Sequence, residues 1–281
     1  MAADHLRGVD SLSLGASPVP PSLARLQAVQ RLKGIVGEGL LNPHAQPIVD
    51  LRLDRIVALE LLFRVSPIAG LSGIRPDQCI ALAEETGGID RIGLAMFQAA
   101  CTLLTDPVIR QRELAINVNL SVLQLRSPNL LPQLRRVVRQ AGVPCDAICL
   151  ELTESHKLDA DPDLLRLLHD LADCGFRLAL DDFGTGYASL AVLRSFPFSH
   201  VKVDRSFVAD IEHAPRSRAL CQVMLQMGEA CDLTVTAEGV ETREQADLLI
   251  AMGYSRLQGF LFGRPRPITE LEAFWSSPSA A

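Results

Sequence analysis

Two adjacent carboxylates, Asp181 and Asp182, follow an apolar run and precede a turn that contains two glycines. The run is typical of a buried strand, and Gly184-Thr185-Gly186 predicts a tight loop at its end. Two ionised carboxylates about 4 Å apart repel by roughly 4 kcal/mol at an effective dielectric constant near 20, so a fold that brings both to one place usually supplies a cation. A divalent metal is the first hypothesis. The alternative is that Asp182 caps the turn and Asp181 is a solvated strand end.

Other strand-like segments also carry polar residues at alternate positions. Successive side chains of a strand point to opposite faces, so the apolar set can meet surrounding helices while the polar set faces the axis of a barrel. The polar residues in this phase are Glu60, Asn119, Glu151, Asp181, Lys202 and Glu238, and most of them come late in their segments. Oxygen donors without cysteine or histidine favour a hard cation, Mg²⁺ or Mn²⁺.

Each of these residues also has an ordinary structural explanation. Glu151 and Glu154 can form a solvated strand end, and Lys202 can neutralise Asp204. Glu241 can interact favourably with the positive amino-terminal end of the dipole of a following helix. A barrel interior is normally filled with branched apolar residues, however, so converging polar residues would be costly unless they bind something.

The composition is that of an ordinary soluble globular chain, with 281 residues of which 48% are hydrophobic and 21% charged. No run approaches the roughly 18 apolar residues of a membrane span. The seven cysteines form no Cys-x-x-Cys pair and the six histidines show no ligand spacing, which predicts a reduced, cytoplasmic chain without a zinc site. A net charge of −6 argues against a nucleic-acid polymer as partner but allows an anionic substrate.

Hydrophobic periodicity divides the chain into strands and helices. Residues 46–53 and 55–65 are strand-like and nearly contiguous, so they must pair antiparallel as a hairpin. Further strands are expected at 114–120, 147–153, 177–182, 200–205, 233–238 and 256–262. Helices are expected at 76–86, 89–104, 130–141, 161–174, 188–195, 215–231, 242–252 and 268–276. This order predicts an α/β fold, a (β/α)₈ barrel with the first strand antiparallel; a doubly wound open sheet is the alternative.

Three parts of the chain are predicted from these patterns. Residues 1–21 are turn-rich and lack periodicity, which is typical of a flexible leader or linker. Residues 22–40 predict an amphipathic helix that either packs on the barrel or connects to a module upstream. Residues 41–281 then form the barrel.

Several short motifs occur in order along residues 46–265. They are Gln46-Pro47-Ile48-Val49-Asp50, Glu60-Leu61-Leu62-Phe63-Arg64, Ala83-Glu84-Glu85-Thr86-Gly87, Asn119-Leu120-Ser121, Glu151-Leu152-Thr153-Glu154, the segment 181–187, the segment 202–207, the segment 237–242 and Gln258-Gly259-Phe260. The chain thereby resembles the EAL domains, phosphodiesterases that hydrolyse cyclic di-GMP. The resemblance implies a TIM-like barrel that opens this second messenger to linear pGpG by two-metal activation of water.

The resemblance also implies roles for individual residues. Two Mg²⁺ or Mn²⁺ ions would be held by Glu60, Asn119, Glu151 and Asp181 at the first position, and by Asp182 with the shared Asp181 at the second. Lys202 would orient or polarise the attacking water, and Glu238 would act as general base or position that water. The residues implied at the substrate are Gln46, Arg64 and Gln258. The loop and supporting positions are Glu154, Asp204, Glu241, Gly184, Thr185 and Gly186.

Four positions depart from the pattern of the family. Leu61 stands where alanine is usual, and the alternation places it toward the helices, so this change should affect packing only. Val65 replaces the usual tryptophan, Ala45 an aromatic residue and Phe260 a tyrosine. These three changes bear on guanine stacking and affinity more than on chemistry.

Partners and rival functions follow from the same resemblance. Family members commonly pair through helices beside the loop after the two aspartates, so a homodimer through 183–195 is expected, and a sensory or GGDEF module can lie outside this chain. Degenerate members act as cyclic di-GMP receptors or protein-interaction platforms, but the intact acidic set favours an enzyme. A third interpretation is an unrelated barrel enzyme that acts on another phosphate ester.

Overall fold

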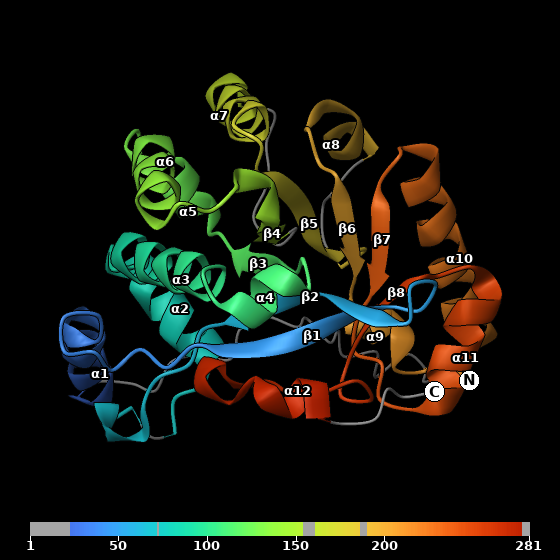
Figure 1. Cartoon of the computed structure of the whole chain (residues 1–281), viewed down its shortest axis with the longest axis horizontal. Coiled ribbons are helices and arrows are strands. Elements are labelled where there is room, and N and C mark those ends of the chain that lie inside the picture. The colour runs from blue at the N-terminus through green and yellow to red at the C-terminus, as the bar shows by residue number, and fades with distance from the viewer. Residues whose placement is uncertain (1–22, 72, 154–160, 186–189, 277–281) are drawn as a thin grey trace, which may run out of the picture.

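The computed structural model describes residues 23–71, 73–153, 161–185 and 190–276. Its centre is a barrel of eight strands, drawn as arrows in Figure 1. The strands are β1 (His44–Asp50), β2 (Arg55–Leu62), β3 (Ala115–Asn119), β4 (Ile148–Thr153), β5 (Arg177–Phe183), β6 (His200–Val203), β7 (Thr234–Ala237) and β8 (Arg256–Gln258). A two-residue strand, β9 (Arg266–Pro267), pairs with β1 outside the closed ring.

The strand order confirms the predicted barrel with its first strand reversed. Strands β2 to β8 pair in parallel in chain order, and β1 closes the ring by pairing antiparallel with both β2 and β8. The turn between β1 and β2 is too short for a parallel crossover, and Asp54 within it adopts a left-handed φ of 47°. The hairpin therefore follows from loop length, as the sequence predicted.

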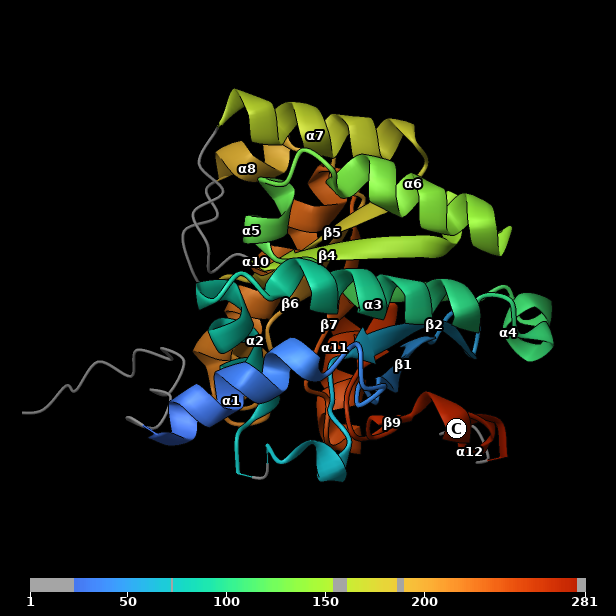
Figure 2. The same ribbon diagram turned by 90° about the vertical axis from the view of Figure 1, so that its left-hand side faces the viewer.

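Helices surround the barrel and connect successive strands (Figure 2). They are α1 (Leu23–Gly34), α2 (Pro76–Glu85), α3 (Ile89–Leu103), α4 (Pro107–Gln111), α5 (Val122–Leu125), α6 (Leu130–Ala141), α7 (Pro162–Asp173), α8 (Leu190–Ser195), α9 (Arg205–Val208), α10 (Pro215–Ala230), α11 (Arg243–Met252) and α12 (Glu272–Ser276). The 3₁₀ turns are Pro67–Ala69, Cys145–Ala147 and Ile268–Glu270. No helix in these described ranges is long and apolar enough to cross a membrane.

The structure differs from the sequence prediction mainly in short elements. Helices α4, α5 and α9 were not predicted, because four or five residues are too few to show a helical period. Each begins at a side-chain cap, from Asp106, Ser121 and Asp204 respectively. The strand expected at 256–262 ends at Gln258, and the helix expected at 22–40 ends at Gly34.

The alternation of the strands places their apolar residues as expected. Leu59 and Leu61 of β2, like Ile116 and Val118 of β3, are almost fully buried in the core that continues into the surrounding helices. The same core includes Ala28, Leu32 and Ile35 in and after α1. The opposite strand face therefore supplies the polar lining of the barrel.

Replacing Gly259 with alanine is expected to destabilise the protein through overlap alone. A β-carbon there would lie 2.0 Å from the backbone oxygen of Val240 and 2.3 Å from its nitrogen, and backbone atoms cannot rotate away. Such overpacking costs about 1–3 kcal/mol or more. Thermal unfolding of Gly259→Ala beside Gly142→Ala, whose β-carbon meets nothing within 4 Å and which adds only left-handed strain, measures the difference. Equal shifts in Tm would contradict the close approach.

Candidate active site

The two aspartates that open the candidate site reach it by a break in strand β5. Asp182 has a φ of 55°, and the pairing of β5 with β6 is irregular between Leu180 and Phe183. This left-handed residue turns the Asp182 side chain toward the side on which Asp181 lies. The sequence predicted a tight loop at the end of this strand, from Gly184 onward; the break lies earlier, at Asp182 itself, within β5.

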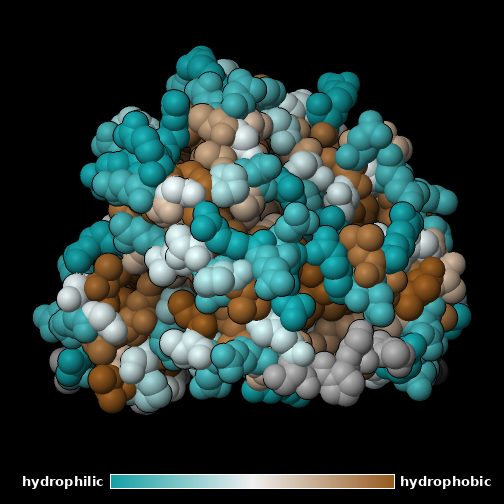
Figure 3. All heavy atoms as spheres, viewed as in Figure 1, coloured by the Kyte–Doolittle hydropathy of each residue, from teal (hydrophilic) through white to brown (hydrophobic). Residues whose placement is uncertain are grey.

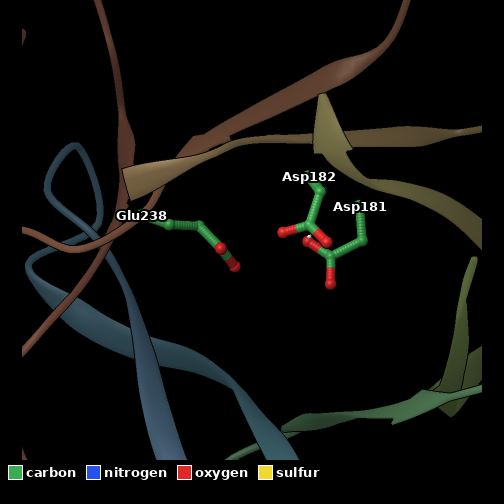
Figure 4. Close-up of side chains that lie close together, drawn as sticks. All are labelled: Asp181, Asp182 and Glu238. Carbon is green, nitrogen blue, oxygen red and sulfur yellow. Dashed lines mark hydrogen bonds between the residues drawn. The ribbon is translucent and has the colours of Figure 1, made fainter. Parts of the chain in front are cut away.

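The carboxylates of Asp181, Asp182 and Glu238 form a compact group (Figure 4). One oxygen from each lies within 4.8 Å of the others, and within the described part of the chain this is the group whose spacing could hold a metal ion. Asp181 also accepts a hydrogen bond from the backbone N–H of Asp182 at 2.9 Å. Glu238, expected to serve the attacking water, thus lies beside the two expected metal ligands.

Lys202 on β6 occupies the centre of the acidic residues. Its Nζ lies 2.6 Å from Glu238 Oε1, 3.1 Å from Glu151 Oε2 and 3.2 Å from Glu60 Oε2, and 3.5 Å from Asp181 Oδ1. The side chain is only 2% exposed. One buried ammonium therefore faces four carboxylates that come from strands β2, β4 and β5 and from the residue after β7.

Amide side chains hold two of the glutamates that contact Lys202, Glu60 and Glu151. Asn119 donates to Glu60 Oε1 at 3.0 Å, and Gln258 donates to Glu60 Oε2 at 2.6 Å. Asn117 donates to Glu151 Oε1 at 2.7 Å. Asn117 was not among the predicted site residues, although it shares the inward phase of Asn119 and could have been found from that alternation.

Burial and mutual repulsion perturb the acids strongly. Burial, and then the negative charge of Asp181, raise the pKa of Asp182 to about 6. Burial likewise raises the pKa of Glu238 to about 8 and that of Glu151 well above its ordinary value, although the charge of Lys202 acts in the opposite direction. Burial alone would raise the pKa of Glu60, but Lys202 and the amide donors outweigh it and hold that pKa below its ordinary value. The negative charge of these carboxylates therefore exceeds what the single ammonium of Lys202 can neutralise.

These properties fit a hard divalent cation. The donors are carboxylate and amide oxygens, the set that Mg²⁺ and Mn²⁺ prefer. Acids whose pKa is raised by burial and like charge are held more easily in the ionised form once a cation is bound. Gln258 Oε1 is buried and has no hydrogen-bond partner among the described residues, so the site also contains an unused acceptor.

The predicted substrate residues line or adjoin the same region. Gln46 Nε2 donates to the Gly263 carbonyl at 3.1 Å, and Gln46 Oε1 accepts from Gln258 at 3.3 Å. Arg64 lies with Glu60, Asp181 and Asp182 in the wall of a cavity of about 480 Å³. The rest of that wall is largely apolar and comes from α2 and α3 together with the ends of β2 and β3 and the residues that follow them.

The end of strand β3 is tied to helix α2. Ser121 Oγ donates to Glu84 Oε1 at 2.6 Å, and the same hydroxyl accepts from the backbone N–H of Leu123 at the start of α5. Because Ser121 lies two residues after Asn119, this contact fixes the strand end that carries the amide. The motif at residues 83–87 thus has a structural connection to the site.

The remaining predicted positions lie at the edge of the cluster or beyond it. Asp204 caps α9 by accepting from the Ser206 N–H, and its charge contributes to the raised pKa of Asp182. Thr185 Oγ1 donates to the Asp182 carbonyl at 2.8 Å. Gly184 has a φ of 98°, and Glu241 has an exposed side chain. Glu154 and Gly186 lie outside the described residues.

Comparison with known proteins identifies relatives of this arrangement. The model of the EAL domain family matches residues 28–265. A Pseudomonas aeruginosa protein named cyclic di-GMP phosphodiesterase NbdA is 37% identical over 251 residues, which cover 89% of this chain and 32% of that protein. The chain spans about a third of the length of the curated relatives it matches.

Solved structures share the fold as well. The structure described as "PaMucR Phosphodiesterase, c-di-GMP complex" superposes with a TM-score of 0.80 at 34% identity and covers 87% of this chain and 99% of that one. The Klebsiella pneumoniae BlrP1 complex with manganese and cyclic di-GMP gives a TM-score of 0.69 at 27% identity, covering 81% of this chain and 56% of that one.

Proposed function

Because this chain belongs to the EAL domain family, we propose that it is a metal-dependent phosphodiesterase that hydrolyses cyclic di-GMP to linear pGpG in bacterial second-messenger signalling. The observation that carries the proposal is the group of Asp181, Asp182 and Glu238, two of which contact Lys202, beside a cavity with an arginine in its wall. The names of the NbdA and MucR relatives support the substrate.

The chain's own residues would bind the substrate and hold the attacking water. Arg64 would meet a phosphate from the cavity wall, and the apolar surfaces of α2 and α3 would receive a guanine. Lys202 Nζ and Glu238 Oε1 lie 2.6 Å apart, in direct contact, so both would contact the attacking water from the same side. The water oxygen would form a bond to phosphorus as the bond from phosphorus to the 3′ oxygen breaks. Glu238 would accept a proton from the water, and the released 3′ oxygen would take up a proton from solvent to become a hydroxyl.

Two divalent cations, Mg²⁺ or Mn²⁺, would be held by the predicted ligands. Glu60, Asn119, Glu151 and Asp181 would hold the first, and Asp182 with Asp181 the second. When bound, these ions neutralise the scissile phosphate, activate the water and stabilise the leaving oxygen. The BlrP1 complexes, which contain manganese or calcium, support a metal requirement in this family.

Hydrolysis is expected to require Mg²⁺ or Mn²⁺, to stop on exhaustive chelation and to return when either ion is added back. The physical reason is the excess of carboxylates over the single ammonium where an anionic phosphate must approach. Chromatography of products formed from cyclic di-GMP measures it, and Ca²⁺ should support binding better than turnover because its coordination is larger and looser. Full activity after chelation would exclude the proposed mechanism. Binding of cyclic di-GMP without pGpG under any divalent ion would favour a receptor.

Assembly and context also remain proposals. A homodimer would form through the segment 183–195, of which Phe183 to Thr185 and α8 are described. Because the chain spans about a third of the length of its curated relatives, it would be part of a longer protein that also contains a sensory or GGDEF module. A cytoplasmic location would fit an intracellular second messenger as substrate.

A further inference from the structure

The end of the barrel opposite the carboxylates carries a second cavity, with a more polar wall than the first. Its volume is about 620 Å³, and its wall is formed by the segments that lead into strands β2, β3, β4, β5 and β8. Figure 2 places α4, part of this wall, at the opposite end from α2 and α5. Figure 3 views the face that carries α4 and shows hydrophilic residues gathered over the middle of the barrel. The cavity is thus the amino-terminal mouth of the barrel.

This wall is rich in arginine. It contains Arg55, Arg110, Arg177 and Arg256, against the two carboxylates Glu113 and Asp146. Arg177 and Arg256 are the first residues of β5 and β8, in phase with the inward-facing Asp181 and Gln258. The inner layer at this end of a barrel is normally apolar, so two guanidinium groups there need an explanation.

The partners of the two inner arginines are unequal. Arg256 Nε lies 3.5 Å from Asp50 Oδ2, and Arg256 Nη1 contacts His200 Nε2 at 3.1 Å. Arg177 has no carboxylate within 4.0 Å and no side-chain hydrogen bond among the described residues, although it is half-buried. One of the two guanidinium groups therefore lacks a counter-charge.

His200 cannot supply that counter-charge. The lowered pKa of its ring reflects burial and the positive charges of the two arginines. Burial, then Arg256 and then Arg177, lower the pKa of His200 to about 3, so the ring is neutral near pH 7. Its Nδ1 lies 2.8 Å from Ser199 Oγ, while Nε2 is free to accept from Arg256. Like charges that converge on a neutral ring favour an anion between them.

We propose that the amino-terminal mouth of the barrel binds a phosphate-bearing small molecule, with its phosphate held by Arg177 and Arg256. Guanidinium forks match phosphate oxygens in pairs, and two of them suit a dianion better than a single carboxylate. The cavity falls in the range of roughly 300–1,000 Å³ typical of small-molecule sites, so it has room for a phosphate ester. This site lies apart from the carboxylate cluster and does not depend on the function proposed there.

The test is equilibrium dialysis of the full chain with inorganic phosphate and with adenosine 5′-monophosphate, at constant ionic strength and with EDTA present. Wild type is expected to bind one equivalent, and Arg177→Ala should bind at least about tenfold more weakly, the scale of a lost charge-assisted pair. Arg177→Lys keeps the charge without the fork and should be intermediate. Arg91→Ala, an exposed arginine on α3 outside the cavity wall, is the matched control and should bind as wild type.

Each outcome decides the proposal. Loss in Arg177→Ala with a wild-type circular dichroism spectrum supports it, and the lysine variant provides the same comparison if the alanine variant does not fold. Tighter binding of the nucleotide than of phosphate would identify an ester as the ligand, and equal binding would identify the free anion. No saturable binding by wild type, wild-type binding by Arg177→Ala, or loss of binding in Arg64→Ala instead, at the other mouth, would each overturn it.

Discussion

Replacing Glu238 with glutamine is expected to lower kcat for cyclic di-GMP by roughly 10²-fold or more while the substrate still binds, the scale of a positioned acid–base group. The amide keeps the shape of the side chain and a contact with Lys202, but it cannot accept the proton of the water. Glu238 approaches the cluster from the end of β7 at 2.6 Å from Lys202, whereas Arg64 lies in the cavity wall. Turnover and binding should therefore separate.

Lys202→Met should give a loss in kcat of similar size, since methionine keeps the aliphatic bulk and removes the ammonium. The experiment measures kcat by product chromatography and the Kd for cyclic di-GMP in Ca²⁺. Glu244→Gln, an exposed glutamate in the first turn of α11, is the matched control for Glu238→Gln. A parallel loss of binding and turnover in both variants would contradict the roles assigned to the two residues.

The second large effect concerns the inequivalence of the two aspartates. Asp181→Asn is expected to abolish metal binding at both positions, because Asp181 faces Lys202 and would be shared by the two ions. Asp182→Asn should keep one ion and substantial affinity for cyclic di-GMP but lose hydrolysis. Asparagine is suitable at Asp182 because it tolerates the left-handed φ of 55°, so the variant tests the charge and not the backbone.

Metal stoichiometry with cyclic di-GMP bound, measured beside product formation, separates the possibilities. Wild type should bind two ions, Asp182→Asn one and Asp181→Asn none. Asp182→Ala serves as the control for backbone strain, because alanine lacks the short polar side chain that stabilises this conformation and should also lower Tm. Identical behaviour of the two asparagine variants would show that the bulge at Asp182 does not divide their roles.

The sequence predicted which face of a strand a residue occupies better than it predicted local backbone angles. Alternation alone placed Glu60, Glu151 and Lys202 on one side of their strands, because the period of a strand is a local property. The positive φ at Asp182 could not be predicted, since nothing in Asp-Asp-Phe-Gly requires a non-glycine residue to be left-handed; the irregular pairing with β6 accompanies it. The fourfold contact of Lys202 depends on closure of the whole ring, which no single segment encodes.

Two further features were within reach of the sequence but were missed for different reasons. Asn117 and Arg177 share the inward phase of residues that were identified, but Arg177 begins β5 and Asn117 lies in the middle of β3, whereas most of the residues identified come late in their segments. The cap of α5 at Ser121 has the signature of a short helix, but four residues give no period to read. Local hydrogen bonds, more than hydrophobic patterns, decide such elements.

The reversal of β1 determines at which end of the barrel the chain enters its first strand. A strand of seven residues spans about 24 Å at roughly 3.4 Å per residue, so a parallel β1 would begin at the arginine-lined mouth. Running the other way, β1 begins beside the catalytic mouth, where Gln46 reaches Gln258, and α1 packs next to α2 through the ion pair of Arg25 with Glu85. The neighbouring Glu84 accepts a hydrogen bond from Ser121, two residues after Asn119. The reversal of β1 thus leaves α1 connected to the rim of the active site by side-chain contacts that run through α2.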